Sequence, residues 1–186
     1  MSLSIPPSGH GSNARFSGCI TLARGDITQQ TGIDAIVTAI PLDLSFEGSL
    51  NESLLAAAGH DLDAFVLENF FRPRAGDVYA TPGFGLPVAH ILFVTIPVWR
   101  ADFERADRDL LRCFRGGVET AQKMGLKRIA FPPIGMGQGG FSPARGARLA
   151  LQGIKERLRG ELAEIRIVCD RPALYEAFAA RMEKRS

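Results

Sequence analysis

Residues 127–154 read KRIAFPPIGMGQGGFSPARGARLALQGI, and this stretch decides the fold class. It opens with KRIAF at 127–131, which we expect to form a strand. It ends in a helical pattern that Ser142 can cap and in which Pro143 takes the first position. A glycine-rich loop joins the two. A strand, loop and helix in this order predict an α/β protein, whose ligands bind beyond the carboxyl ends of parallel strands.

The same alternation of elements continues on both sides of this stretch. Apolar, partly β-branched runs at 34–40 and 90–96 predict strands that are buried on both faces. Further strands are expected at 16–23, 77–81 and 165–169, and helices at 51–58, 60–70, 104–124 and 173–182. The order of the elements predicts a mostly parallel sheet with helices on both faces.

The length of 186 residues suits one domain. Residues 1–14 are rich in Ser, Pro and Gly, so we expect a flexible N-terminal segment followed by a single domain over 15–186. No apolar run approaches the roughly 20 residues of a membrane span, and no secretory signal is visible. We therefore expect no contact with a membrane.

Net charge and cysteine content indicate which partners and which cellular compartment to expect. A net charge of +2, with arginines scattered along the chain, disfavours a nucleic-acid partner. The three cysteines are Cys19, Cys113 and Cys169, an odd number far apart in the sequence, which favours the reducing cytoplasm over a disulfide framework. Cys113 falls in the apolar stripe of a predicted helix, so burial is expected. The histidines lack metal-ligand spacing, and we predict neither a metal site nor a cofactor.

The loop from Gly135 to Gly140 has the composition of a phosphate cradle. Four glycines in six residues leave backbone N–H groups uncovered, and the following helix adds its positive end. The alternative is a plain flexible turn, but a turn needs fewer glycines. The loop also satisfies G-x-G-x-x-G, yet Pro132, Pro133 and Ile134 separate it from its strand. That separation disfavours a nicotinamide-dependent dehydrogenase.

Several motifs in this order resemble those of the macrodomain family. They are Gly25-Asp-Ile-Thr28, Asp34-Ala-Ile-Val37, Ala57-Ala-Gly59, Thr81-Pro-Gly-Phe-Gly-Leu-Pro87 and Ile129-Ala-Phe-Pro132. Together they cover nearly the whole chain, from about Cys19 to Phe178. The resemblance implies a three-layer α/β/α fold with a mostly parallel mixed sheet. It also implies a site for ADP-ribose or an ADP-ribose 1″-phosphate derivative.

The resemblance assigns roles to individual residues. Asp26 matches the aspartate that accepts a hydrogen bond from the adenine amino group, although a turn or helix cap would also explain it. Phe141 would contact the distal ribose or, alternatively, pack beneath the loop. The ligand-binding residues implied in this way are Asp26, Ile27, Gly48, Ser49, Leu50, Gly135, Met136, Gly137, Gln138, Gly139, Gly140 and Phe141.

The chain departs from the family pattern at the reactive end of the site. Hydrolytic macrodomains carry two asparagines where this sequence has Thr38 and Pro41, and an acid where it has Asn51. A neutral amide cannot act as a general base. The remaining candidates for catalysis are Asp43, Glu47, Asn51 and Glu52, and each acid among them also suits a polar loop or an exposed helix start.

Three functions remain open at this point. The first is binding of ADP-ribose or a related derivative, free or attached to a partner protein, with little or no hydrolysis. The second is an ADP-ribosyl hydrolase or an ADP-ribose 1″-phosphate phosphatase that uses non-standard residues. The third is a scaffold, or a protein that binds another nucleotide, with the distal pocket closed.

Overall fold

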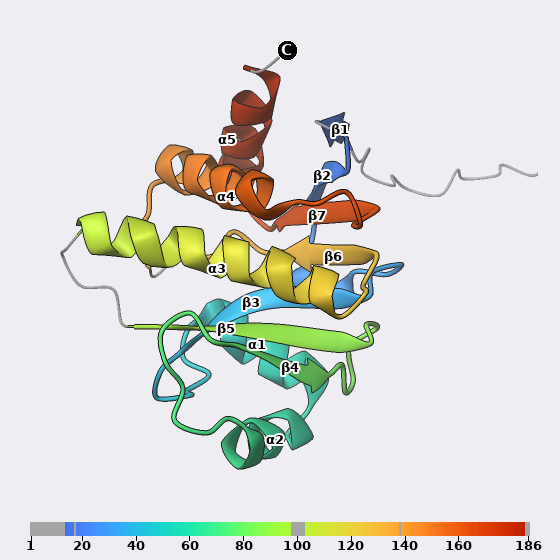
Figure 1. Cartoon of the computed structure of the whole chain (residues 1–186), viewed down its shortest axis with the longest axis vertical. Coiled ribbons are helices and arrows are strands. Elements are labelled where there is room, and N and C mark those ends of the chain that lie inside the picture. Colours follow the sequence, from blue (N-terminus) through green and yellow to red (C-terminus); the bar gives the residue numbers. More distant parts are fainter. Residues whose placement is uncertain (1–13, 17, 98–102, 138, 185–186) are drawn as a thin grey trace, which may run out of the picture.

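The computed structural model describes residues 14–16, 18–97, 103–137 and 139–184, which contain one seven-stranded sheet (Figure 1). The strands are β1 (Ala14–Phe16), β2 (Ile20–Arg24), β3 (Ala35–Pro41), β4 (Val78–Pro82), β5 (His90–Ile96), β6 (Arg128–Phe131) and β7 (Glu164–Cys169). Their spatial order is β1-β2-β7-β6-β3-β5-β4. The five inner strands run parallel, and β1 and β4 pair antiparallel at the two edges. The predicted mostly parallel, mixed sheet is confirmed.

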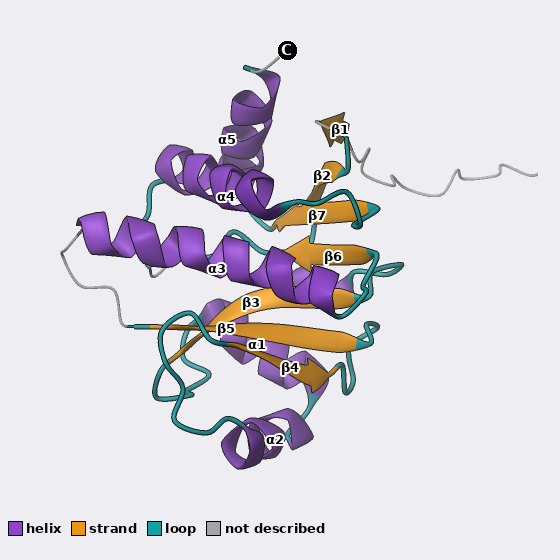
Figure 2. Cartoon of the chain, viewed as in Figure 1, coloured by secondary structure: helices purple, strands orange, loops and turns teal. Residues whose placement is uncertain are grey.

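Helices cover both faces of the sheet (Figure 2). They are the 3₁₀ turn η1 (Ile27–Gln29) and the α-helices α1 (Ser49–Ala58), α2 (Asp61–Asn69), α3 (Phe103–Lys123), α4 (Pro143–Arg157) and α5 (Pro172–Glu183). One buried cluster joins α3, α4 and α5 to the sheet, and a second cluster joins α1, α2 and η1 to the other face. The fold is therefore the expected three-layer α/β/α sandwich. None of the helices in the described ranges combines the length and apolar character needed to cross a bilayer.

Strand β3 lies in the middle of the sheet and is buried on both faces. Val37 packs in the cluster with α3 and α4, whereas Ile36 and Ile40 pack in the cluster with α1 and α2. This explains why its sequence is apolar without alternation, because each face of the strand meets a helical layer. Thr38 points to the α1 side, as the alternation of side chains along a strand requires.

The N-terminal part of the sheet differs from the sequence prediction. The strand expected at 16–23 is two strands, β1 and β2, which pair antiparallel with Phe16 opposite Ile20. Gly18 adopts a φ of 73°, which reverses the chain between them at a position where other residues would be strained. The predicted flexible segment 1–14 lies outside the described residues, except for Ala14, which begins β1.

Local signals set the ends of the helices, as predicted. Gly59 adopts a φ of 99° and separates α1 from α2, and its N–H donates to Leu55 O. The Ser142 hydroxyl accepts a hydrogen bond from Arg145 N at 3.3 Å, and Pro143 is the first residue of α4. Cys113 is fully buried in α3, as its place in the apolar stripe predicts.

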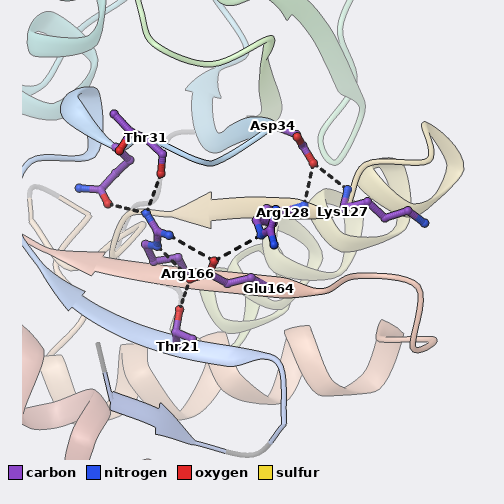
Figure 3. A network of polar contacts seen from close by, with 8 residues as sticks. Thr21, Thr31, Asp34, Lys127, Arg128, Glu164 and Arg166 are labelled. Carbon is purple, nitrogen blue, oxygen red and sulfur yellow. Dashed lines mark hydrogen bonds and ion pairs between the residues drawn. The ribbon is translucent and has the colours of Figure 1, made fainter. Parts of the chain in front are cut away.

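A polar network occupies the edge of the sheet at which the parallel strands begin (Figure 3). Glu164, at the start of β7, accepts hydrogen bonds from Thr21 Oγ1 at 2.7 Å and from Arg166 Nε at 2.9 Å. Asp34, just before β3, accepts from the backbone N–H groups of Lys127 and Arg128, both at 2.8 Å. These bonds join β2, β7, β6 and β3 at their amino ends. Ligands are expected at the opposite edge, where the parallel strands end.

We predict that the Glu164 carboxylate stabilises the fold and that this contribution is lost in acid. Burial acts to raise its pKa, but the hydrogen bonds and charges of Arg166, Thr21 and Arg128 outweigh burial, so the pKa lies below its ordinary value. A lowered folded-state pKa gives stability that is complete above the unfolded-state pKa and disappears as the pH falls through the folded-state value. At neutral pH, Glu164→Gln should lower the free energy of unfolding by about 2 kcal/mol.

Urea unfolding of wild type and Glu164→Gln over a pH series tests this prediction. The difference between the two proteins should be largest at neutral pH and should shrink in acid. Glu161→Gln, which removes an exposed carboxylate three residues earlier, is the matched control and should change little. A difference that stays constant with pH would contradict the assigned role of the charge.

Candidate functional site

A cavity of about 680 Å³ lies at the edge of the sheet where the parallel strands end. It is lined by the loops that follow β2, β7, β6, β3 and β5, which are neighbours in the sheet in this order. Five strands at the usual spacing of about 4.8 Å span about 19 Å. The volume is typical of small-molecule sites, and the length suits an extended ligand with several chemical groups in a row.

Asp26 lies at the β2 end of this cavity and has two roles available. Its Oδ1 accepts hydrogen bonds from Thr28 N at 2.8 Å and from Thr28 Oγ1 at 2.7 Å, which caps η1. No described residue donates to its Oδ2, and Asp26 is exposed, so this oxygen is available to a ligand. The cap and the ligand contact were alternatives in the sequence, and the two oxygens of one carboxylate accommodate both. Ile27 is buried beside it and also lines the cavity.

The glycine loop after β6 forms the middle of the cavity wall. Gly135, Gly137 and Gly139 line the cavity, and Gly135 and Gly140 adopt φ values of 83° and 77°. Phe141 N donates to Gly135 O at 3.1 Å and closes the loop. These conformations fit the expected cradle, in which backbone N–H groups turn toward one anion.

Three residues predicted to bind the ligand, Met136, Gly140 and Phe141, lie outside the cavity lining. The Met136 side chain is buried against Gly146 of α4, where a Cβ would lie 2.4 Å from Met136 Cγ. Phe141 is buried in the core, which corresponds to its alternative role of packing beneath the loop. Gly140 is also outside the lining. The Met136 and Phe141 side chains turn inward because burial of apolar surface is favourable. Gln138 lies outside the described residues.

The start of α1 forms the wall after β3. Gly48 precedes α1 with a φ of 98°, and Gly48, Ser49 and Leu50, which are predicted to bind the ligand, line the cavity. Asn51 also lines it but is only 7 % exposed. Its Nδ2 donates to Ala39 O at 3.1 Å, which fixes the amide orientation and leaves Oδ1 without a partner.

The three candidate acids differ in their position relative to the cavity. Glu47 lines the cavity, whereas Asp43 and Glu52 are exposed and lie outside the lining. The Asp43 carboxylate accepts a hydrogen bond from Ser45 N at 3.0 Å, and this bond lowers its pKa, which weakens it as a base. Cys169 ends β7 beside the cavity, but burial raises the pKa of its thiol to about 12, so it stays a neutral thiol.

The sequence predicted that the loop after Cys169 borders a ligand site, but it did not single out the residues in that loop. Asp170, Arg171 and Leu174 line the cavity. The Arg171 Nη2 donates to Met136 O of the glycine loop at 2.9 Å. The rule that ligands bind beyond strand ends indicated this loop, but no local motif distinguished these side chains within it.

The fold and the site define an α/β/α protein with an elongated ligand cavity across the ends of five parallel strands. The sequence profile of the Macro domain matches residues 37–150. The chain therefore belongs to the Macro domain family, as the motifs in its sequence indicated.

Individual relatives agree with this assignment. A macro domain-containing protein of Streptomyces coelicolor is 32% identical, over 88% of this chain and 98% of its own. The Oceanobacillus iheyensis macrodomain, solved with ADP, superposes with a TM-score of 0.82 at 25% identity, covering 93% of this chain and 95% of its own. The Trypanosoma brucei macrodomain in complex with ADP-ribose has a TM-score of 0.75 at 26% identity, covering 87% of this chain and 68% of its own.

Proposed function

We propose that this protein binds ADP-ribose or a closely related derivative, free or attached to a protein, with little or no hydrolase activity. The observation that carries the proposal is the order of groups along the cavity. A carboxylate oxygen of Asp26 that accepts no hydrogen bond from the described residues lies at one end, the glycine loop in the middle and the start of α1 at the other. An adenine amino group, a diphosphate and a distal ribose would meet these three groups in the same order.

The chemistry of each contact supports this placement. The Asp26 carboxylate would accept a charge-assisted hydrogen bond from the adenine amino group. Backbone N–H groups of the loop and the positive end of α4 favour a diphosphate. At the far end Thr38 Oγ1 and Asn51 Oδ1 are buried without partners. Such atoms are costly to leave unpaired, so a ribose hydroxyl nearby would be favoured.

The same end of the cavity supports binding without turnover. Asn51, in the cavity wall, is a neutral amide and cannot take a proton from water. Positioned acid–base catalysis contributes about 10²- to 10⁴-fold, so its loss should leave little activity. Pro41 has no amide side chain to orient a ligand.

One observation favours the second candidate, a hydrolase or phosphatase acting on ADP-ribose derivatives. Glu47 is a carboxylate in the cavity wall close in sequence to α1, and it could activate water. The third candidate, a scaffold with a closed pocket, has less support because the cavity is open and Phe141 packs in the core instead.

The compartment and the partner form part of the proposal. Cys19, Cys113 and Cys169 are free, which supports a reducing, cytoplasmic location. Where the ADP-ribose is attached to a protein, that ADP-ribosylated protein would be the partner.

Isothermal titration calorimetry with ADP-ribose, ADP and AMP tests the binding. We expect saturable binding, tighter for ADP-ribose than for AMP because the diphosphate and distal ribose add contacts. Absence of heat at high ligand concentration would overturn the proposed function. The same protein should then be incubated with ADP-ribosylated protein and with ADP-ribose 1″-phosphate, beside Glu47→Gln. Turnover by wild type that disappears in Glu47→Gln would establish the second candidate instead.

A further inference from the structure

The cavity wall carries more negative than positive side chains, which disfavours an anionic ligand. Asp26, Glu47 and Asp170 bring carboxylates to the wall, whereas Arg171 is the one cation among the described residues that line it. A diphosphate would add further negative charge to this site. The glycine loop and helix ends offer only partial positive charges, so the full charge of a guanidinium matters here.

Strand pairing places Arg171 beside the glycine loop. Strands β6 and β7 are parallel neighbours with Phe131 opposite Ile167, so the loops that follow them emerge side by side. The Arg171 Nη2 donates to Met136 O at 2.9 Å, and its Nε lies 3.8 Å from Asp170 Oδ1. The Met136 side chain is buried, which fixes the position of the residue whose carbonyl accepts this hydrogen bond. The guanidinium is thus held against the wall of the cradle.

The Arg171 guanidinium has more N–H donors than its hydrogen bond to the loop uses. Its side chain is 56% exposed, and a guanidinium has several N–H groups in a planar fork that matches phosphate oxygens. The bond to Met136 uses one of these groups. Nε faces Asp170, and Arg171 lines the cavity between Asp26 and the glycines in the strand order, so its further N–H groups are available to a ligand there.

We propose that Arg171 recognises the diphosphate of the bound nucleotide and sets the preference for nucleoside diphosphates over monophosphates and nucleosides. This inference rests on the proposed function and adds a residue to it. Arg171 holds the loop through Met136 O while its remaining N–H groups donate to a phosphate oxygen. Asp170 lies close enough to orient the guanidinium without occupying it.

Calorimetry with ADP, AMP and adenosine on wild type, Arg171→Gln and Arg171→Lys tests the proposal. We expect Arg171→Gln to weaken ADP binding by about tenfold to hundredfold, AMP binding by less, and adenosine binding not at all. Arg171→Lys should fall in between, because it keeps the charge and loses the fork. The affinity of wild type for ADP should fall with added salt more steeply than that of Arg171→Gln. Arg148→Gln, an exposed arginine on α4 outside the cavity lining, is the matched control for loss of charge.

The outcomes separate this inference from the proposed function. If wild type binds ADP and Arg171→Gln binds it equally well, Arg171 does not recognise phosphate, and the proposed function stands. An equal loss for ADP and adenosine would also overturn the inference, since it would show a general effect on the loop. If wild type binds none of the nucleotides, the proposed function fails and the inference fails with it.

Discussion

Asp26→Ala is expected to weaken ADP-ribose binding by about 10- to 100-fold, the usual effect of losing a hydrogen bond to a charged group. The substitution removes the free Oδ2 that would meet the adenine amino group. It also removes Oδ1, which caps η1 through Thr28 N. Loss of a cap costs about 1 kcal/mol of stability, so both affinity and the free energy of unfolding should fall. Calorimetry and urea unfolding measure the two effects separately.

Asp26→Asn distinguishes the two roles of this carboxylate. An asparagine keeps one oxygen, which can still accept from Thr28 N and cap η1. Its other terminal group is an amide NH₂, a donor that cannot accept from the adenine amino group. We expect near wild-type stability together with most of the loss of affinity seen in Asp26→Ala. If Asp26→Asn binds ADP-ribose as well as wild type, the carboxylate acts only as a cap.

Gly117→Val is expected to have the largest effect on stability, a loss of about 3 kcal/mol or more. Gly117 faces the sheet from α3, and a Cβ there would lie 2.6 Å from Val37 Cγ1 and 3.0 Å from the Phe131 ring. Both partners are fully buried on central strands and have no free space to move into. Valine adds two methyl groups beyond that Cβ. Urea unfolding gives the change in free energy of unfolding.

Alanine at two adjacent positions of α3 provides the matched control. At Gly116 a Cβ would lie 3.9 Å from Gly76 O, which is ordinary van der Waals contact, and 3.1 Å from the tip of the Val78 side chain. Replacing a helical glycine by alanine typically adds about 1 kcal/mol of stability, which should offset that contact. Gly116→Ala should therefore be neutral or stabilising, and Gly117→Ala destabilising. Equal effects at the two positions would mean that α3 can move away from the sheet.

The glycine loop shows which features of the site can be predicted from sequence and which cannot. Its composition predicted an anion cradle, because four glycines in six residues have a consequence for the backbone that needs no knowledge of neighbours. The direction of individual side chains was not predictable. Met136 was expected to contact the ligand and is buried against Gly146 on α4. That packing depends on how α4 sits above the loop.

Local chemistry in the sequence determined most of the elements of this protein. The apolar run of β3 indicates burial on both faces, Gly59 divides α1 from α2, and Ser142 with Pro143 begins α4. Each of these signals acts within a few residues, through propensity, capping or a positive φ, so it is visible without the fold. The motifs that resemble macrodomains are of the same kind and identified the family.

Only the tertiary structure decided which side chains share the cavity. Strand β7 comes last in the sequence but lies between β2 and β6, and this pairing brings Arg171 to Met136 O and to the cavity of Asp26. The burial of Asn51 likewise depends on α1 packing against the end of β3. Asp26 and Arg171 are 145 positions apart in the sequence, and no local pattern could show that they line one cavity, because their placement arises from pairing between strands that are distant along the chain.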